Sequence, residues 1–153
     1  MKKIKIFFPF LLSLSLLMAQ SQVGECNSKA LKDAVLDLLK PYKYDSSKII
    51  RFEYSGEEQV KETEVPLFIG EKYRFIFNLN AAPLGAEVRV YDKSSNSRKR
   101  KLLYSSKNKD TDKPGIFVFE PQKSKTMYID IVIPPTDKQN QRGCVVFVLG
   151  YKI

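Results

Sequence analysis

The residue types that could do chemistry fall into three groups along the chain. Two cysteines, Cys26 and Cys144, can pair or react; carboxylates gather between Glu57 and Glu64; and four basic residues follow one another at Arg98, Lys99, Arg100 and Lys101. Carboxylate pairs can transfer protons, and clustered cations bind polyanions by displacing their counterions. The chain has no histidine, so the commonest general base and metal ligand is missing.

The acidic group does not resemble a catalytic centre. Glu57, Glu58, Glu62 and Glu64 stand among polar residues, which is typical of a solvated segment and not of a pocket that shifts the pKa of a carboxyl group. We therefore expect a protein that is not an enzyme and needs no cofactor, with a hydrolase as the remote alternative.

A calcium-like pattern is equally weak. Asn108, Asp110 and Asp112 alternate like the first ligands of a calcium-binding loop. Such a loop also needs glycine at its sixth position and glutamate at its twelfth, where this chain has Lys113 and Phe119. The segment predicts a plain turn and no metal site.

The N-terminal segment resembles a secretory signal peptide. Lysines at positions 2, 3 and 5 precede an apolar run from Ile6 to Met18, and small residues follow at Ala19 and Ser21. A membrane anchor would need about 20 apolar residues, and Glu25 before Cys26 does not fit a lipidation signal. We predict cleavage of residues 1–21, no transmembrane segment afterwards, and a single secreted domain, periplasmic or extracellular, over residues 22–153.

Export decides the chemistry expected of the cysteines. Oxidising compartments favour disulfides, and two cysteines allow a single intramolecular pairing. The sequence therefore predicts a Cys26–Cys144 disulfide, which leaves no free thiol to act as a nucleophile.

Hydrophobic periodicity predicts one helix followed by strands. Residues 28–40 place Leu31, Val35 and Leu38 on one stripe, with Asn27 or Ser28 as the cap and Pro41 at the end. The period then changes to two, in segments separated by turn residues. These segments predict a mainly β fold, an antiparallel β-sandwich of about eight strands resembling a jelly roll; they cover residues 48–54, 60–69, 70–79, 86–92, 101–105, 115–121, 126–134 and 143–151.

The last two strands are apolar on both sides. A strand with water on one face should alternate more cleanly than residues 143–151 do. The N-terminal helix is the element available to cover the second face, although a dimer interface would also explain the pattern. Because Cys144 has the same parity as Val146 and Val148, a disulfide from Cys26 would hold the helix against that face.

The basic tract lies between two predicted strands and after the turn-forming residues 93–97. This position predicts a hairpin tip, with possible contacts from Arg98–Lys101 to an anionic glycan, lipid or protein. No aromatic residue is interleaved to stack on bases, so nucleic acid is not expected. The formal net charge of +9, to which the signal segment contributes three lysines, permits anionic partners without naming one.

Two tyrosines raise a second possibility. Tyr91 and Tyr128 fall on the weaker apolar side of their strands, where they could be exposed and stack on a sugar ring. A carbohydrate-binding module is therefore the alternative function.

Residues 70–151 resemble the secreted β-sandwich modules of the bacterial pre-peptidase C-terminal type, and also the GOLD-type sandwich. The segments that carry this resemblance are "GEKYRFIFNL", "VRVYDKSSN", "LLYSS", "GIFVFEPQKSKTMYIDIVI" and "CVVFVLGY". The resemblance implies a bacterial accessory module that aids secretion, surface attachment or ligand contact, and it assigns no functional residue. We expect a non-catalytic binding module that contacts its partner through loops, in an oligomeric state that the sequence leaves open.

Overall fold

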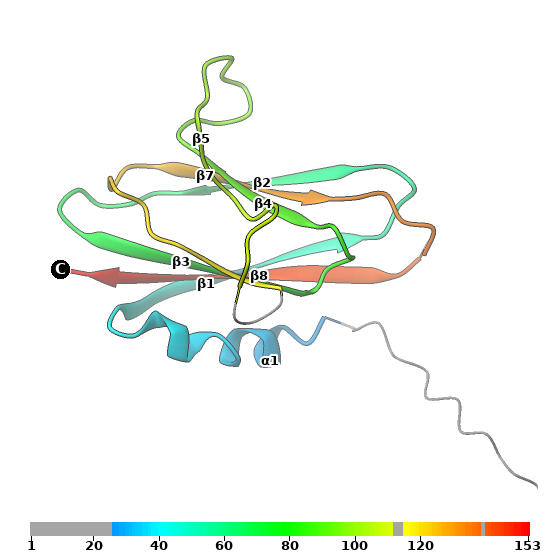
Figure 1. Cartoon of the computed structure of the whole chain (residues 1–153), viewed down its shortest axis with the longest axis horizontal. Coiled ribbons are helices and arrows are strands. Elements are labelled where there is room, and N and C mark those ends of the chain that lie inside the picture. The colour runs from blue at the N-terminus through cyan, green and yellow to red at the C-terminus, as the bar shows by residue number, and fades with distance from the viewer. Residues whose placement is uncertain (1–25, 112–114, 139) are drawn as a thin grey trace, which may run out of the picture.

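The computed structural model describes residues 26–111, 115–138 and 140–153, in which eight strands form two antiparallel sheets (Figure 1). The predicted signal peptide, and Asp112 and Lys113 of the calcium-like segment, lie outside these residues. The strands are β1 (Lys43–Glu53), β2 (Gln59–Val65), β3 (Lys72–Ala81), β4 (Glu87–Tyr91), β5 (Leu102–Ser105), β6 (Ile116–Phe119), β7 (Met127–Ile133) and β8 (Arg142–Lys152).

The strand order is that of a jelly roll. One sheet has the order β1-β8-β3-β6 and the other β2-β7-β4-β5, so that first pairs with last, second with seventh, third with sixth and fourth with fifth. Such nested pairs arise when one long antiparallel ribbon is folded over on itself. The predicted sandwich is confirmed, and each predicted strand segment corresponds to one observed strand. β1 begins earlier than predicted, at Lys43, because its exposed first residues still pair with β8.

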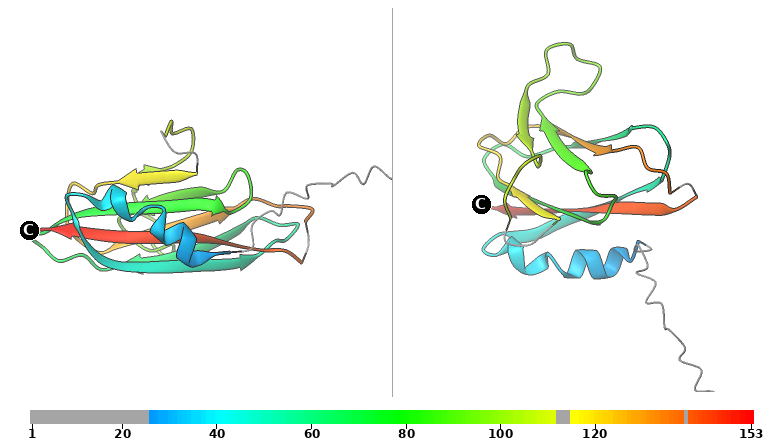
Figure 2. Two further views of the ribbon diagram at one scale, coloured as in Figure 1. Left: turned by 90° about the horizontal axis from the view of Figure 1, so that it is seen from below. Right: turned by 45° about the vertical axis from the view of Figure 1, so that its right-hand side comes forward.

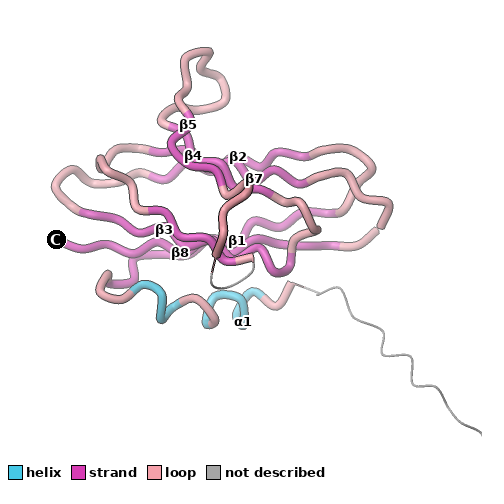
Figure 3. The backbone as a smooth tube through the Cα atoms, in the orientation of Figure 1, coloured by secondary structure: helices cyan, strands magenta, loops and turns pink. Residues whose placement is uncertain are grey.

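The main core lies between the two sheets, which Figure 3 shows as two layers. Alternate residues of each strand point inward, as the period of two predicts. On β3 these include Phe75 and Phe77, both fully buried, and Phe147 of β8 packs against both rings. Phe119 of β6 meets Phe75 edge-on, with ring centroids 5.8 Å apart.

A second apolar layer lies on the outer face of the β1-β8-β3-β6 sheet. The short helix α1 (Ser28–Asp33) and the 3-10 helix η1 (Leu36–Leu39) cross this face (Figure 2). Val35, between the two helices, and Leu39 of η1 pack on apolar residues of β3, β6 and β8. The predicted helical cover of the sheet is confirmed, and it explains why β8 is apolar on both sides.

The predicted helix over residues 28–40 is wrong in its extent. The α-helix, capped by the side chain of Asn27, ends at Asp33, and the rest is a 3-10 turn that buries Leu39 more deeply than Leu38. At this ending, Asn78 of β3 donates to the carbonyl oxygen of Leu31 at 2.9 Å, and the amide of Val35 binds the carbonyl oxygen of Lys32 instead of that of Leu31. The 3-10 turn that follows is held on the sheet by Arg74, which donates to the carbonyl oxygens of Leu38 and Lys40.

The predicted disulfide is confirmed. Cys26 and Cys144 are bonded, with Cα atoms 5.6 Å apart and 118 positions apart in the sequence. Cys144 is fully buried on the same face as Val146 and Val148. The bond therefore holds the start of the helical segment on the sheet that this segment covers.

Replacing both cysteines with alanine should lower the free energy of unfolding by about 4–5 kcal/mol, because the bond closes a very long loop. Urea denaturation of the oxidised protein and the variant measures this difference. Amides of residues 30–39 should also lose more protection from hydrogen exchange than amides of β3, since these helices are directly tethered by Cys26. Lys48→Ala, an exposed change on β1, is the control, and equal stability of variant and parent would contradict the prediction.

Candidate functional site

The outer face of the β2-β7-β4-β5 sheet carries polar and charged side chains where the other sheet carries its helix. Strand register places Glu62, Asp130 and Arg89 in one row, with Ser105 next to Arg89 on β5. In the adjacent row Tyr128 of β7 lies directly opposite Tyr91 of β4. The two tyrosines that the sequence suggested for stacking on a sugar ring therefore come together on this face, both half-buried.

Asp130 is the most deeply buried charged residue that the structure describes on this face. Its side chain is 3% exposed, and its Oδ2 accepts a hydrogen bond from the Arg100 guanidinium at 2.9 Å. Its Oδ1 has no hydrogen-bond partner within the described residues. Burial raises the pKa of the Asp130 carboxyl, and Arg100 opposes that rise. Arg100 thus neutralises a carboxylate that would be costly to bury alone.

Arg100 reaches Asp130 from the loop between β4 and β5. Its guanidinium carbon lies 3.8 Å from the centroid of the Tyr91 ring, and its Nη1 is 3.7 Å from Glu62. One face of Tyr91 is therefore covered by a cation, at a distance suited to cation–π attraction. Arg98, Lys99 and Lys101 behave differently: they are exposed, and among the described residues none forms an ion pair. The basic tract thus separates into one structural arginine and three free cations.

The β4–β5 loop, which projects from the sandwich in Figure 1, is fixed at its base. The amide of Lys101 donates to Asp92 Oδ1 at 2.6 Å, and the amide of Asp92 donates to the carbonyl oxygen of Lys101. The first of these bonds lowers the pKa of the Asp92 carboxyl. The amide of Ser95 donates to Glu62 Oε2 at 2.7 Å. These bonds hold the cationic tip in one place relative to the sheet.

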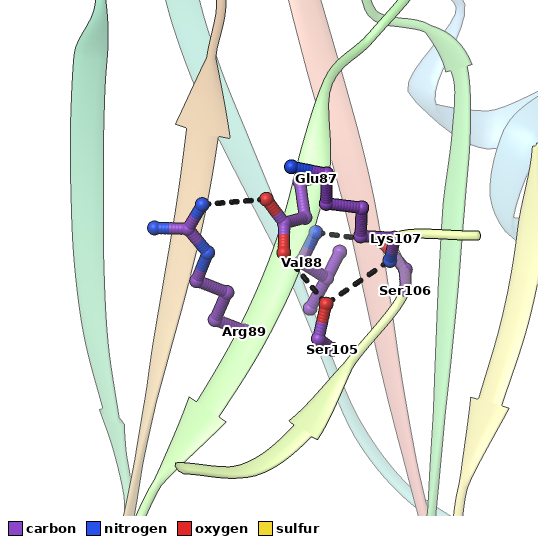
Figure 4. A network of polar contacts seen from close by, with 6 residues as sticks. All are labelled: Glu87, Val88, Arg89, Ser105, Ser106 and Lys107. Atoms are coloured by element: carbon purple, nitrogen blue, oxygen red, sulfur yellow. Dashed lines mark hydrogen bonds and ion pairs between the residues drawn. The ribbon is translucent and has the colours of Figure 1, made fainter. Parts of the chain in front are cut away.

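A second polar network fixes the other end of β5 to β4 (Figure 4). The Glu87 carboxylate accepts hydrogen bonds from Arg89 and from the Ser105 hydroxyl, each at 2.6 Å. These bonds, the one from Arg89 most strongly, hold the pKa of Glu87 below its usual range. The Ser106 hydroxyl in turn accepts from the amide of Val88. β5 has only four residues, so side-chain bonds at both ends compensate for its short backbone ladder.

A groove opens beside the basic tract, between the edge strands β5 and β6. Its volume is about 500 Å³. Leu102, Leu103 and Phe119 form an apolar part of its lining, whereas Lys101, Lys123 and Lys125 contribute cations and Asp92 and Glu120 contribute carboxylates. The β6–β7 loop, residues 120–126, supplies Lys123 and Lys125, and Lys125 lies 3.7 Å from Asp92.

The loops at this end of the sandwich touch one another. Ser124 of the β6–β7 loop donates to the carbonyl oxygen of Glu71 in the β2–β3 loop, residues 66–71. Together with the contact between Lys125 and Asp92, this joins three loops into a continuous surface. We call the β2–β3, β4–β5 and β6–β7 loops together the basic loop surface.

The remaining candidates from the sequence do not assemble into a centre. Glu57 and Glu58 lie in the β1–β2 loop, whereas Glu62 and Glu64 belong to β2 and are not in a solvated loop. Asn108 adopts a left-handed conformation (φ 55°) in a turn after β5. Within the described residues no three metal-ligating side chains come together. No helix in these ranges is long and apolar enough to cross a membrane.

Sequence reasoning missed the polar partners of Arg100. Asp130 stands in the otherwise apolar segment 127–133, on the weaker parity, and a lone acid in such a strand was a detectable signal. That its partner would be Arg100 follows from strand register and loop path, which no local pattern contains.

Comparison with known proteins does not assign the chain to a family. No protein-family model matches the chain, and no curated protein is significantly similar to it. The resemblance of residues 70–151 to pre-peptidase C-terminal and GOLD-type modules therefore stays a prediction, and the chain is defined here by its fold, a disulfide-linked β-sandwich.

Arg100→Met should destabilise the protein by about 3 kcal/mol at neutral pH, because it leaves the Asp130 carboxylate buried without its cation. The pKa of Asp130 is already raised by burial and should rise further in the variant. The loss should therefore shrink as the pH falls and the carboxyl takes up a proton in both proteins. Urea denaturation over a pH series measures this loss of unfolding free energy.

The matched control for this prediction is Lys99→Met. It removes a neighbouring exposed cation, and the change in unfolding free energy should stay within about 0.5 kcal/mol. The double variant Arg100→Met with Asp130→Asn should recover most of the loss. A pH-independent loss in Arg100→Met would show that packing on Tyr91, and not charge, is what the arginine supplies.

Proposed function

We propose that this protein is a non-catalytic, exported binding module that holds an anionic partner on its basic loop surface. The proposal depends on one observation: the four residues of the basic tract have different roles. Arg100 is committed to Asp130, while Arg98, Lys99 and Lys101 project from an anchored loop without carboxylate partners in the described part of the chain. Cations fixed in this way lose little freedom when an anion binds.

The groove beside the tract supports the same proposal. Lys101, Lys123 and Lys125 contribute to its lining together with apolar side chains, and such a lining suits an anionic group attached to a less polar body. Glu120 pairs with Arg74, and Asp92 lies 3.7 Å from Lys125, so the charges of Lys101 and Lys123 are the ones that the lining keeps available.

Chemical arguments support the proposed export and the proposed role without catalysis. The apolar leader predicts secretion, and the disulfide is suited to an oxidising compartment such as the periplasm or the extracellular space. Both sulfur atoms are bonded and the sequence lacks histidine, so neither a thiol nucleophile nor a histidine base is available. The carbohydrate alternative through Tyr91 and Tyr128 has weaker support, since Arg100 already occupies one face of the Tyr91 ring.

The test is binding to a soluble polyanion, heparin, at several salt concentrations. The triple variant Arg98→Ser, Lys99→Ser, Lys101→Ser spares the structural Arg100. We expect it to weaken binding roughly tenfold to a hundredfold, since each cation near an anionic surface contributes about 1 kcal/mol. Its affinity should also depend less steeply on salt than that of the parent.

The charge-matched control is Lys48→Ser, Lys61→Ser, Lys138→Ser. These lysines are exposed and lie on β1, β2 and the β7–β8 loop, away from the basic loop surface. If this control weakens binding as much as the first triple variant does, net charge and not the loop surface governs the interaction. Salt-insensitive binding of neutral sugars that is lost in Tyr128→Ala would instead support the carbohydrate alternative.

A further inference from the structure

The tip of the β2–β3 loop exposes two large apolar side chains side by side. Phe68 is 75% exposed and Ile69 is 93% exposed, although Leu67 just before them is buried in the core. Single exposed apolar residues are ordinary in proteins. Two adjacent apolar residues at the tip of a loop form a protruding apolar surface, and contact with water is unfavourable for it. Such a surface indicates a site of interaction.

Hydrogen bonds to the backbone of this tip hold it in place. The amide of Phe68 donates to the Tyr73 hydroxyl at 3.1 Å, and that hydroxyl donates to Glu71 at 2.6 Å. The amide of Glu71 closes the turn on the carbonyl oxygen of Phe68, with Gly70 at φ 96° in the position where a tight turn needs a positive φ. Because Tyr73 is itself buried, the two apolar side chains are presented by a fixed turn and cannot easily fold back.

Exposed lysines adjoin the β2–β3 loop that carries this tip. Lys72 follows it directly and pairs across strands with Lys152, so two exposed lysines lie opposite each other in the sheet. Like charges in this arrangement repel and destabilise a sheet. An anionic surface at this end would relieve the repulsion. Two acids, Glu71 and Asp45, also lie near the Tyr73 hydroxyl that binds the tip.

The apolar tip also belongs to the basic loop surface. The β2–β3 and β6–β7 loops lie together at the left of Figure 1 and are joined by the bond from Ser124 to Glu71. Exposed Lys123 and Lys125 flank that bond. One end of the molecule therefore combines protruding apolar side chains with exposed lysines on the same and the adjoining loop and strands.

From this combination we infer that the anionic partner is the surface of an anionic lipid bilayer. Phe68 and Ile69 enter the boundary between headgroups and acyl chains, while the lysines bind the headgroup phosphates. A soluble polyanion could satisfy the cations but would leave the apolar tip in water. Apolar insertion and electrostatic attraction together give membrane attachment that neither supplies alone. This inference rests on the proposed function, of which it specifies the partner.

The experiment measures co-sedimentation of the full mature chain with vesicles of phosphatidylglycerol and phosphatidylcholine, and with vesicles of phosphatidylcholine alone. The double variant Phe68→Ser, Ile69→Ser should lower partition onto anionic vesicles about tenfold or more while its heparin binding stays within about twofold. Ile69→Ser should lower partition, whereas Leu84→Ser should not. Leu84 is a matched control because it is fully exposed in the β3–β4 loop at the other end of the sandwich.

A second readout is spectroscopic. The chain contains no tryptophan, so Phe68→Trp introduces a single reporter whose emission should shift to the blue on anionic vesicles, and Leu84→Trp should show no shift. Equal partition of the double variant and the parent, no shift at position 68, or equal binding to both kinds of vesicle would overturn the inference. Heparin binding that persists in any of these cases leaves the proposed function standing, whereas binding to neither heparin nor vesicles defeats both.

Discussion

The central strands β8 and β3 of the β1-β8-β3-β6 sheet are buried on both faces, and the rest of the molecule depends on this. The inner face of the sheet packs on the second sheet, and its outer face packs under α1 and η1. Asn78 and Arg74 are polar residues on that outer face, and each binds carbonyl oxygens of the helical segment. The Cys26–Cys144 bond holds the beginning of the segment at the point where β8 begins. Apolar packing, polar bonds and a covalent link thus act on the same short helices.

In the part of the chain that the structure describes, the other sheet has no helix on its outer face, which carries charged side chains. A buried acid there is tolerable because a loop brings a cation to it, and Arg100 thereby ties the β4–β5 loop to the strands beneath. The same bond determines which basic side chains remain available. With Arg100 committed to Asp130, the cations that remain available are Arg98, Lys99 and Lys101, on a loop that backbone bonds also anchor.

Alternation predicted much of the fold because it is local. The parity of Tyr73, Phe75 and Phe77, and the shared parity of Cys144 with Val146, were readable from the sequence and correspond to real faces of the sheets. Strand order was not readable, because the pairing of β1 with β8 joins segments about a hundred residues apart. The end of the α-helix was misplaced for a similar reason: its last turn binds Asn78, a residue of β3 that is remote in sequence.

The candidate site shows the same limit. The basic tract and the tyrosines were found as separate patterns, yet the structure places Arg100 on Tyr91 and so makes them parts of one arrangement. The exposed pair Phe68 and Ile69 looked like the continuation of a strand, since apolar residues predict burial on average. Only the turn fixed by Tyr73 shows that they point away from the core. The type of a residue determines which contacts its side chain can make. Whether a partner can reach that side chain depends on the path of the backbone.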